Sequence, residues 1–255
     1  MIIIKISGGL GNQLFKLNKA LEISKNYKNL YLDLFSYESD KYQRKYHFYN
    51  DLDQLKILSL NQKRLLNITK KILNRANIIR HYDEMLNDYN DFLNDKVRIK
   101  FLSGNWEENV NPDANNLSIL QSLFQKAESK NDEIVAVHFR TKDYEIRLKE
   151  DYYKKAIEQF NNNYIFHIFG DDDKYLKDKI PSIFKNRTFE LFNSDNPIND
   201  FERLLSYRNY ISSNSTFCWW AIMLNNEKNL NVISPKTWIK NRDYQIFKPE
   251  NWKQI

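Results

Sequence analysis

The sequence predicts an α/β protein built from two doubly wound domains, and three observations support this. Short apolar runs alternate with segments of helical periodicity, an order typical of parallel sheets covered by helices. Several runs end in glycine or small polar residues, as strands do before a ligand-binding turn. A length of 255 residues is enough for two small domains of this kind. We expect the domain boundary within residues 112–130, which gives domains 1–125 and 126–255.

In the N-terminal half, the β-branched run at residues 2–6 predicts a strand. Residues 7–12 then form a glycine-rich turn, and apolar residues at helical spacing predict a helix up to residue 23. Residues 30–34 are expected to form the next strand. Residues 56–80 contain seven Lys or Arg and no Asp or Glu, with apolar residues at helical spacing. This pattern predicts a basic amphipathic helix or a pair of helices.

In the C-terminal half the alternation is regular. The predicted strands are residues 133–139, 164–169, 188–192, 210–213 and 230–234. The predicted helices are residues 152–160, 200–207 and 216–224, with an acidic helix start after residue 169. Ligands of such sheets lie at the carboxyl ends of the strands.

The composition limits the classes of function. A net charge of +6 suits an anionic ligand or surface without choosing between nucleic acid, phosphate and lipid. Cys218 is the only cysteine, so no intramolecular disulfide can form. Neither a secretory signal nor an apolar stretch of about 18 residues is found, so we expect a cytoplasmic protein.

Three of the five glycines lie within residues 8–11, between the first strand and its helix. Glycine there lets the backbone approach a ligand, and amides at a helix N-terminus favour anions. The spacing matches neither a dinucleotide fingerprint nor a P-loop. A tight turn without a ligand is the alternative, and the spacing does not decide between them.

His138 and Arg140 lie at the carboxyl end of a predicted strand, on the same side of it, with Asp143 three residues further on. Arg140 offers a fork of donors for a pyrophosphate, and Asp143 could orient a neighbour or accept a proton. A surface ion pair is the alternative. The position at a strand end favours the functional interpretation.

Two further polar runs follow strands. Residues 171–173 are all Asp and could hold a divalent metal, but we favour an acidic helix start that caps amides. Residues 212–216 can cap the next helix and also donate to phosphate. Trp219 and Trp220, in that helix, are expected to pack in the interior instead of serving as platforms for a sugar.

These motifs together resemble glycosyltransferase family 11, the α1,2-fucosyltransferases, over nearly the whole chain. The resemblance starts with the run Gly-Gly-Leu-Gly-Asn-Gln-Leu-Phe at residues 8–15. Further matching segments follow in order: residues 104–106, 137–140, 152–157, 169–172, 200–201, 213–220 and 233–238. Where the family usually shows His-Xxx-Arg-Arg-Xxx-Asp, this chain has Thr141 in place of the second arginine, followed by Lys142.

The resemblance implies a GT-B-like fold of two Rossmann-like domains facing a cleft, with the acceptor side in residues 1–125 and GDP-fucose held by residues 126–255. It implies a metal-independent, inverting galactoside α1,2-fucosyltransferase without a cofactor, active in O-antigen or other polysaccharide synthesis. By similarity, Arg140 grips the β-phosphate, His138 positions the donor and Asp200 lies near guanosine. The expected catalytic residues are His138, Arg140 and the base Asp143, with Glu145 as the second candidate for the base. The expected donor-binding residues are Gly8, Gly9, Gly11, Asn12, His138, Arg140, Asp200, Asn214, Ser215 and Thr216.

Other functions stay open at this point. One is a sugar transferase of the same fold with another donor or linkage, and a metal-dependent variant using Asp171 and Asp173 is conceivable. Another is a basic module that binds membrane or nucleic acid through residues 56–80, although the lack of interleaved aromatic residues argues against specific RNA binding. The expected partners are GDP-fucose and a galactose-containing oligosaccharide, with no nucleic acid. A lipid-linked acceptor would place residues 56–80 at the inner membrane face.

Overall fold

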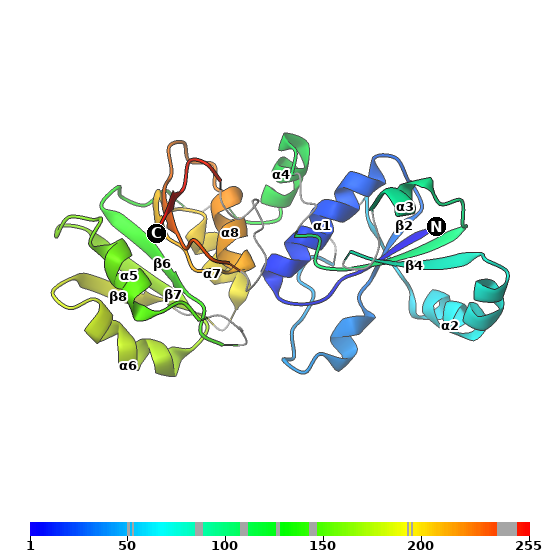
Figure 1. Ribbon diagram of the computed structural model, residues 1–255, viewed down its shortest axis with the longest axis horizontal. Coiled ribbons are helices and arrows are strands. Elements are labelled where there is room, and N and C mark those ends of the chain that lie inside the picture. Colours follow the sequence, from blue (N-terminus) through cyan, green and yellow to red (C-terminus); the bar gives the residue numbers. More distant parts are fainter. Residues whose placement is uncertain are drawn as a thin grey trace. The chain divides into compact units, whose positions relative to one another are not determined.

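The computed structural model describes residues 1–49, 52, 54–84, 89–107, 112–125, 128–142, 147–192, 194, 196–238 and 249–255. The chain divides into two compact units between Leu123 and Phe124, where the sequence analysis places the boundary after residue 125. Each unit is a parallel sheet with helices (Figure 1). No helix in the described ranges has the length and apolar character needed to cross a membrane.

Unit 1 contains a five-stranded sheet in the order β3-β2-β1-β5-β4, with every pairing parallel. Its strands are β1 (Ile2–Lys5), β2 (Leu30–Asp33), β3 (Lys56–Ile57), β4 (Ile79–Asp83) and β5 (Ile99–Ser103). Its helices are α1 (Leu10–Ser24), the 3₁₀ helix η1 (Phe35–Ser39), α2 (Leu60–Arg75), α3 (Tyr89–Asn94) and α4 (Ala114–Gln121). The strand order reverses between β1 and β5, so the switch point of this sheet lies there.

The two faces of the first sheet are covered differently. Helix α1 packs against β1, β2 and α4. On the face that carries Ile3 and Lys5, α2 closes a cavity of about 210 Å³ with Leu66 and Asn67. The basic segment 56–80 is therefore neither one helix nor a helix pair: α2 is flanked by β3 and the start of β4. Leu58 and Ile79 lie outside the helix and are buried, because they belong to the sheet layer.

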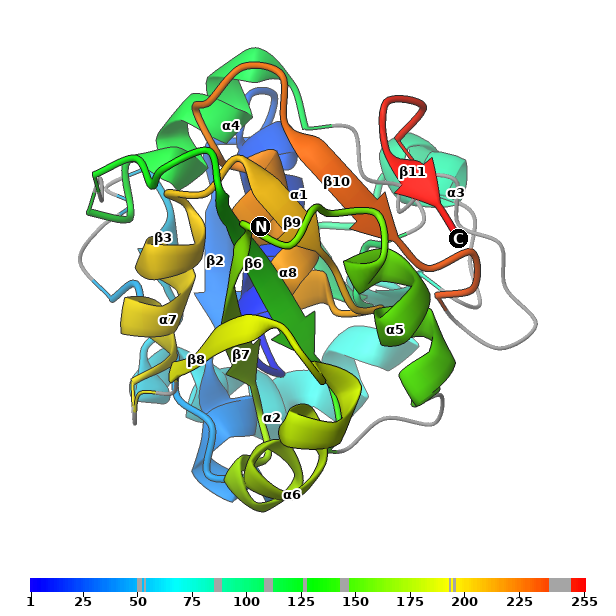
Figure 2. The same ribbon diagram turned by 90° about the vertical axis from the view of Figure 1, so that its left-hand side faces the viewer.

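Unit 2 contains a six-stranded parallel sheet in the order β11-β10-β9-β6-β7-β8 (Figure 2). Its strands are β6 (Ile134–Phe139), β7 (Ile165–Gly170), β8 (Thr188–Phe192), β9 (Asn209–Ile211), β10 (Asn231–Ser234) and β11 (Lys253–Gln254). Its helices are α5 (Glu150–Ile157), α6 (Asp173–Ile183), α7 (Pro197–Leu204) and α8 (Thr216–Met223). From the central strand β6 the chain runs to β7 and β8 on one side and returns to β9 on the other, which places the switch point between β6 and β9.

Alternation along β6 assigns the helices of unit 2 to the two faces of the sheet. Val135, Val137 and Phe139 join one hydrophobic cluster with residues of α5 and α6. His138 faces the other side, where its ring lies 5.7 Å from that of Phe217 in α8. Hence α5 and α6 cover one face, and α7 and α8 cover the other.

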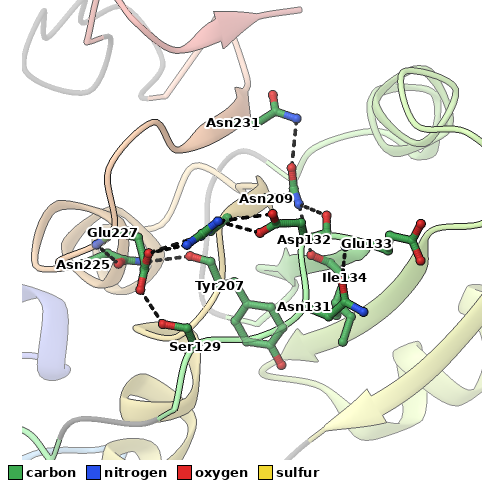
Figure 3. Close-up of polar contacts among 11 residues, drawn as sticks. Ser129, Asn131, Asp132, Glu133, Ile134, Tyr207, Asn209, Asn225, Glu227 and Asn231 are labelled. Atoms are coloured by element: carbon green, nitrogen blue, oxygen red, sulfur yellow. Dashed lines mark hydrogen bonds and ion pairs between the residues drawn. The ribbon is translucent and has the colours of Figure 1, made fainter.

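The amino edge of this sheet is tied together by a polar network (Figure 3). The side-chain amide of Asn209 donates to the carbonyl of Asp132 over 2.7 Å, and that of Asn231 donates to Asn209 over 3.1 Å. Arg208 pairs with Asp132 at 2.9 Å and with Glu227 at 3.1 Å. These contacts join the starts of β6, β9 and β10, so the amino edge has a structural role.

Candidate functional site

The carboxyl edge of the sheet in unit 2 gathers polar side chains from three strands. Arg140 follows β6, Asp171 follows β7 and residues 212–216 follow β9. Their convergence follows from the parallel order, since these strands are neighbours and end at the same edge. The sequence-predicted residues His138, Arg140 and Asn214 to Thr216 are therefore brought together at the switch point.

Asp171 holds the segment after β6. Its carboxylate accepts from the Thr141 amide over 2.7 Å, from the Thr141 hydroxyl over 2.9 Å and from the Lys142 amide over 3.2 Å. It also pairs with Nε of Arg140 at 3.3 Å. Asp171 thus orients Arg140 and holds the buried Thr141, the residue that replaces the family's second arginine.

The acidic run after β7 starts a helix, as expected. Asp172 is the N-cap of α6, and its carboxylate accepts from the amide of Tyr175 over 3.1 Å. Asp173 lies in the first turn, where a negative charge complements the helix dipole. Protein donors therefore engage the carboxylates of Asp171 and Asp172.

His138 links β6 to β9 across the switch point. Its Nδ1 lies 2.7 Å from the hydroxyl of Ser213, and both residues are buried. Burial lowers the pKa of His138 to about 4, and the charge of Arg140 lowers it as well, while Asp171 opposes the shift. The imidazole is therefore neutral at pH 7 and contributes a hydrogen bond at this edge without adding charge.

Small hydroxyls before α8 complete the edge. Among the described residues, the side-chain oxygens of Ser212 and Ser215 are buried and have no hydrogen-bond partner. Ser215 is the N-cap of α8, yet its side chain makes no capping bond. Because a buried hydroxyl without a partner costs about 1–3 kcal/mol, these groups indicate a polar ligand at the helix N-terminus.

The other predicted residues of unit 2 have separate surroundings. The amide of Asn214 is buried and donates to the carbonyl of Trp238 over 3.2 Å. Asp200, in the first turn of α7, accepts from the amide of Ser194 over 3.2 Å, and burial raises its pKa. Asp143 and Glu145 lie outside the described residues. Trp219 and Trp220 are fully buried, which confirms that they pack in the interior.

The glycine turn of unit 1 lies at the switch point of its own sheet. Gly8 has a φ of +88°, and a Cβ there would lie 3.0 Å from the side chain of Asn12, so only glycine fits without strain. The Gly8 carbonyl accepts from Gln13 over 3.3 Å and from Tyr37 over 3.1 Å. Gly9 is the N-cap of α1. The turn that holds the predicted residues Gly8, Gly9, Gly11 and Asn12 is thus fixed in place.

A buried cation beside this turn was missed in the sequence analysis. Lys16, only 2% exposed, donates to the Ser7 carbonyl over 2.8 Å and to its hydroxyl over 2.9 Å. Glu107 and Glu84, which follow β5 and β4, are its electrostatic partners. These carboxylates lie far from Lys16 in the sequence, so no local charge pattern reveals the cluster and only the fold brings it together.

Lys16 gives a testable pH dependence. Burial lowers its pKa from 10.5 to about 8, against the opposing effect of Glu107. The unfolded chain binds the Lys16 proton more tightly than the folded protein does. The unfolding free energy therefore increases as pH rises from about 8, the pKa in the folded protein, toward 10.5, the pKa in the unfolded chain. We expect the wild type to gain about 2 kcal/mol of unfolding free energy from this group between pH 7.5 and 9.5. Denaturant unfolding of wild type and Lys16→Met at both pH values measures it, and an equal gain in the two proteins would exclude Lys16 as the source.

The two parallel sheets with flanking helices define a GT-B-like fold, and comparison with a solved structure agrees. Over 99% of this chain and 92% of the other, the structure resembles E. coli heptosyltransferase WaaC with ADP, with a TM-score of 0.51 and 8% identity. The model of the family described as glycosyl transferase family 11 matches residues 1–255. The chain belongs to glycosyl transferase family 11 and is a glycosyltransferase.

Two curated relatives, both from Escherichia coli, show sequence similarity. The alpha-1,2-colitosyltransferase is 25% identical over 297 aligned positions, which cover 100% of this chain and 99% of the relative. The O-antigen biosynthesis glycosyltransferase WbnK is 26% identical over 159 positions, covering 56% of this chain. That second match spans about half the length of WbnK, at 51%.

Proposed function

We propose that this glycosyltransferase moves L-fucose from GDP-β-L-fucose to a galactose-type hydroxyl of a glycan, forming an α1,2 linkage with inversion. Unit 2 binds the donor, and unit 1 provides the acceptor side. The proposed compartment is the cytoplasm and the proposed pathway is the synthesis of O-antigen or a related polysaccharide. Membership of family 11 supports the class of reaction.

The carboxyl edge of unit 2 is the observation that carries the proposal. A guanidinium held by Asp171, a neutral imidazole and two buried hydroxyls that have no partner among the described residues lie around the switch point and the N-terminus of α8. A pyrophosphate suits these groups, because it accepts hydrogen bonds and its charge complements both Arg140 and the helix dipole. Asp200, whose raised pKa reflects partial burial, is proposed to lie near the base of the nucleotide.

The relatives support a sugar transferred to a position 2 hydroxyl in an O-antigen, since their names include an alpha-1,2 linkage and O-antigen biosynthesis. The name of the colitosyltransferase gives colitose, and not fucose, as the transferred sugar. A second candidate function is therefore the same reaction with a different sugar on the nucleotide. The two candidates differ only in the identity of the donor sugar.

The proposed mechanism is a single in-line displacement. A base removes the proton of the acceptor hydroxyl, the sugar passes through an oxocarbenium-like state, and Arg140 and the amides of α8 stabilise the departing phosphate. The base is proposed to be Asp143, with Glu145 as the second candidate. An acidic residue of unit 1 is the further alternative, and Glu107 now gives that alternative a specific residue at the edge beside the glycine turn.

We propose that no metal takes part, because Arg140 and the helix N-terminus supply positive charge and the Asp171 and Asp172 carboxylates are engaged by protein donors. Calorimetric titration with GDP, UDP and CDP in EDTA tests the donor and the metal together. We expect GDP to bind in EDTA and expect UDP and CDP to show no comparable heat of binding. Binding of UDP in preference to GDP, or GDP binding only after Mg²⁺ is added, would contradict the proposal. Turnover with a panel of GDP-sugars then identifies the sugar.

A further inference from the structure

Helix α2 carries apolar side chains on two separate sides. Leu66 and Leu73 are partly buried, and Leu66 lines the cavity beneath the helix. Leu65, Ile68 and Ile72 are 62%, 79% and 70% exposed, the highest values among large apolar side chains in the described residues. Packing on the sheet therefore accounts for one side of the helix and leaves the other unexplained.

The three exposed residues form one stripe, which we call the outer stripe: Leu65, Ile68 and Ile72. Spacings of three and four residues place them above one another on a helix. The exposure of the outer stripe does not result from loose packing of α2 on the sheet, because Lys63 of α2 pairs with Asp33 of β2 at 3.2 Å. Ser59 and Gln62 form a capping box that fixes the start of the helix. The sheet-facing side is thus anchored while the outer stripe points away from it.

Positive charge accompanies the outer stripe. The sixteen residues of α2 include five Lys or Arg and no Asp or Glu. Arg64 and Arg75 are exposed, and they lie four residues before Ile68 and three after Ile72, along one border of the stripe. An apolar stripe bordered by cations is the pattern of a helix lying in the interface of an anionic membrane.

We propose that the outer face of α2 docks on the surface of an anionic phospholipid bilayer. The outer stripe enters the boundary between headgroups and acyl chains, while Arg64 and Arg75 contact lipid phosphates. Charge complementarity selects this partner: a second copy of the chain would bring the same two exposed arginines, Arg64 and Arg75, to the contact and would oppose like charges. Nucleic acid would leave the outer stripe in water, and α2 has no aromatic residue for stacking on bases. The proposal does not depend on the identity of the sugar donor.

Co-sedimentation with vesicles tests the docking surface. The wild type should bind vesicles of 30% phosphatidylglycerol in phosphatidylcholine, bind pure phosphatidylcholine more weakly, and lose affinity at 0.5 M NaCl because salt screens the arginines. Leu65→Gln with Ile68→Gln and Ile72→Gln should reduce partitioning by at least about 100-fold. Arg64→Gln with Arg75→Gln should reduce it about 25-fold, or about fivefold per charge.

Matched controls change the same chemistry elsewhere. Lys28→Gln with Lys96→Gln removes two exposed charges from unit 1, and Leu93→Gln with Leu191→Gln removes two exposed leucines. Both control variants should bind anionic vesicles within about twofold of the wild type. The proposal is overturned if the wild type does not bind anionic vesicles. It is also overturned if the control variants lose as much vesicle affinity as the α2 variants do. Sedimentation velocity without lipid tests the alternative that the outer stripe mediates self-association. A wild-type dimer that becomes monomeric in the outer-stripe variant would support self-association and contradict membrane docking.

Discussion

Arg140→Ala is expected to weaken GDP binding about 100-fold, which corresponds to about 3 kcal/mol, and to reduce turnover at least as much. The variant loses the guanidinium that Asp171 holds at the switch point of unit 2. The local backbone should persist, because Asp171 also accepts from the amides of Thr141 and Lys142. Calorimetry with GDP and a thermal melt of the same sample separate loss of binding from loss of folding.

The matched control is Arg208→Ala, at the opposite edge of the same sheet. Arg208 also pairs with carboxylates, those of Asp132 and Glu227, but it lies among the strand starts. We expect this variant to bind GDP as the wild type does. Comparable loss of GDP affinity in the two variants would mean that Arg140 acts through general stability, and unchanged affinity in Arg140→Ala would remove it from the donor site.

The second large effect concerns His138 and pH. Its pKa in the folded protein, about 4, lies below the value of 6.5 that applies to an unperturbed side chain. The unfolded chain therefore binds the proton more tightly, and the associated stability is present above pH 6.5 and lost as pH falls toward 4. Between pH 7 and pH 5 this group should lower the unfolding free energy by about 2 kcal/mol.

His138→Gln tests this, because glutamine can keep a hydrogen bond to Ser213 without titrating. Urea unfolding at pH 7 and pH 5 measures how much unfolding free energy is lost on acidification, and this loss should be smaller in the variant than in the wild type. The affinity of the variant for GDP at pH 7 should fall about tenfold. His167→Gln is the matched control, since His167 is also buried and hydrogen-bonded to Tyr207 at 2.7 Å, with a pKa lowered by burial. His167→Gln should also reduce the unfolding free energy lost between pH 7 and pH 5, but it should leave GDP affinity unchanged. If His138→Gln lost as much unfolding free energy between pH 7 and pH 5 as the wild type, His138 would not be the source of that loss.

Prediction from sequence succeeded best in unit 2. Buried strands such as β6 and β7 stand out as apolar runs between polar turns, and the motifs at their ends are local in sequence. Boundaries shifted where a cap was overlooked: α7 starts at Pro197 because Asn196 caps it and proline suits the first helical turn. In unit 1, β4 and β5 were missed. Strand β4 follows a basic helix directly, and Arg80 and His81 within it are exposed, so it lacks a continuous apolar signal.

The sequence alone determined the α/β class, the glycine turn and the order of motifs that marks the family, because periodicity and turn chemistry are properties of neighbouring residues. Only the tertiary structure decided which strands are neighbours, and hence that Asp171 holds the segment around Arg140 and that His138 meets Ser213 from 75 residues away. It also decided that one apolar side of α2 packs on the sheet while the other stays exposed. Each of these depends on long-range packing, in which a side chain's partner is chosen by the sheet order and not by its distance along the chain.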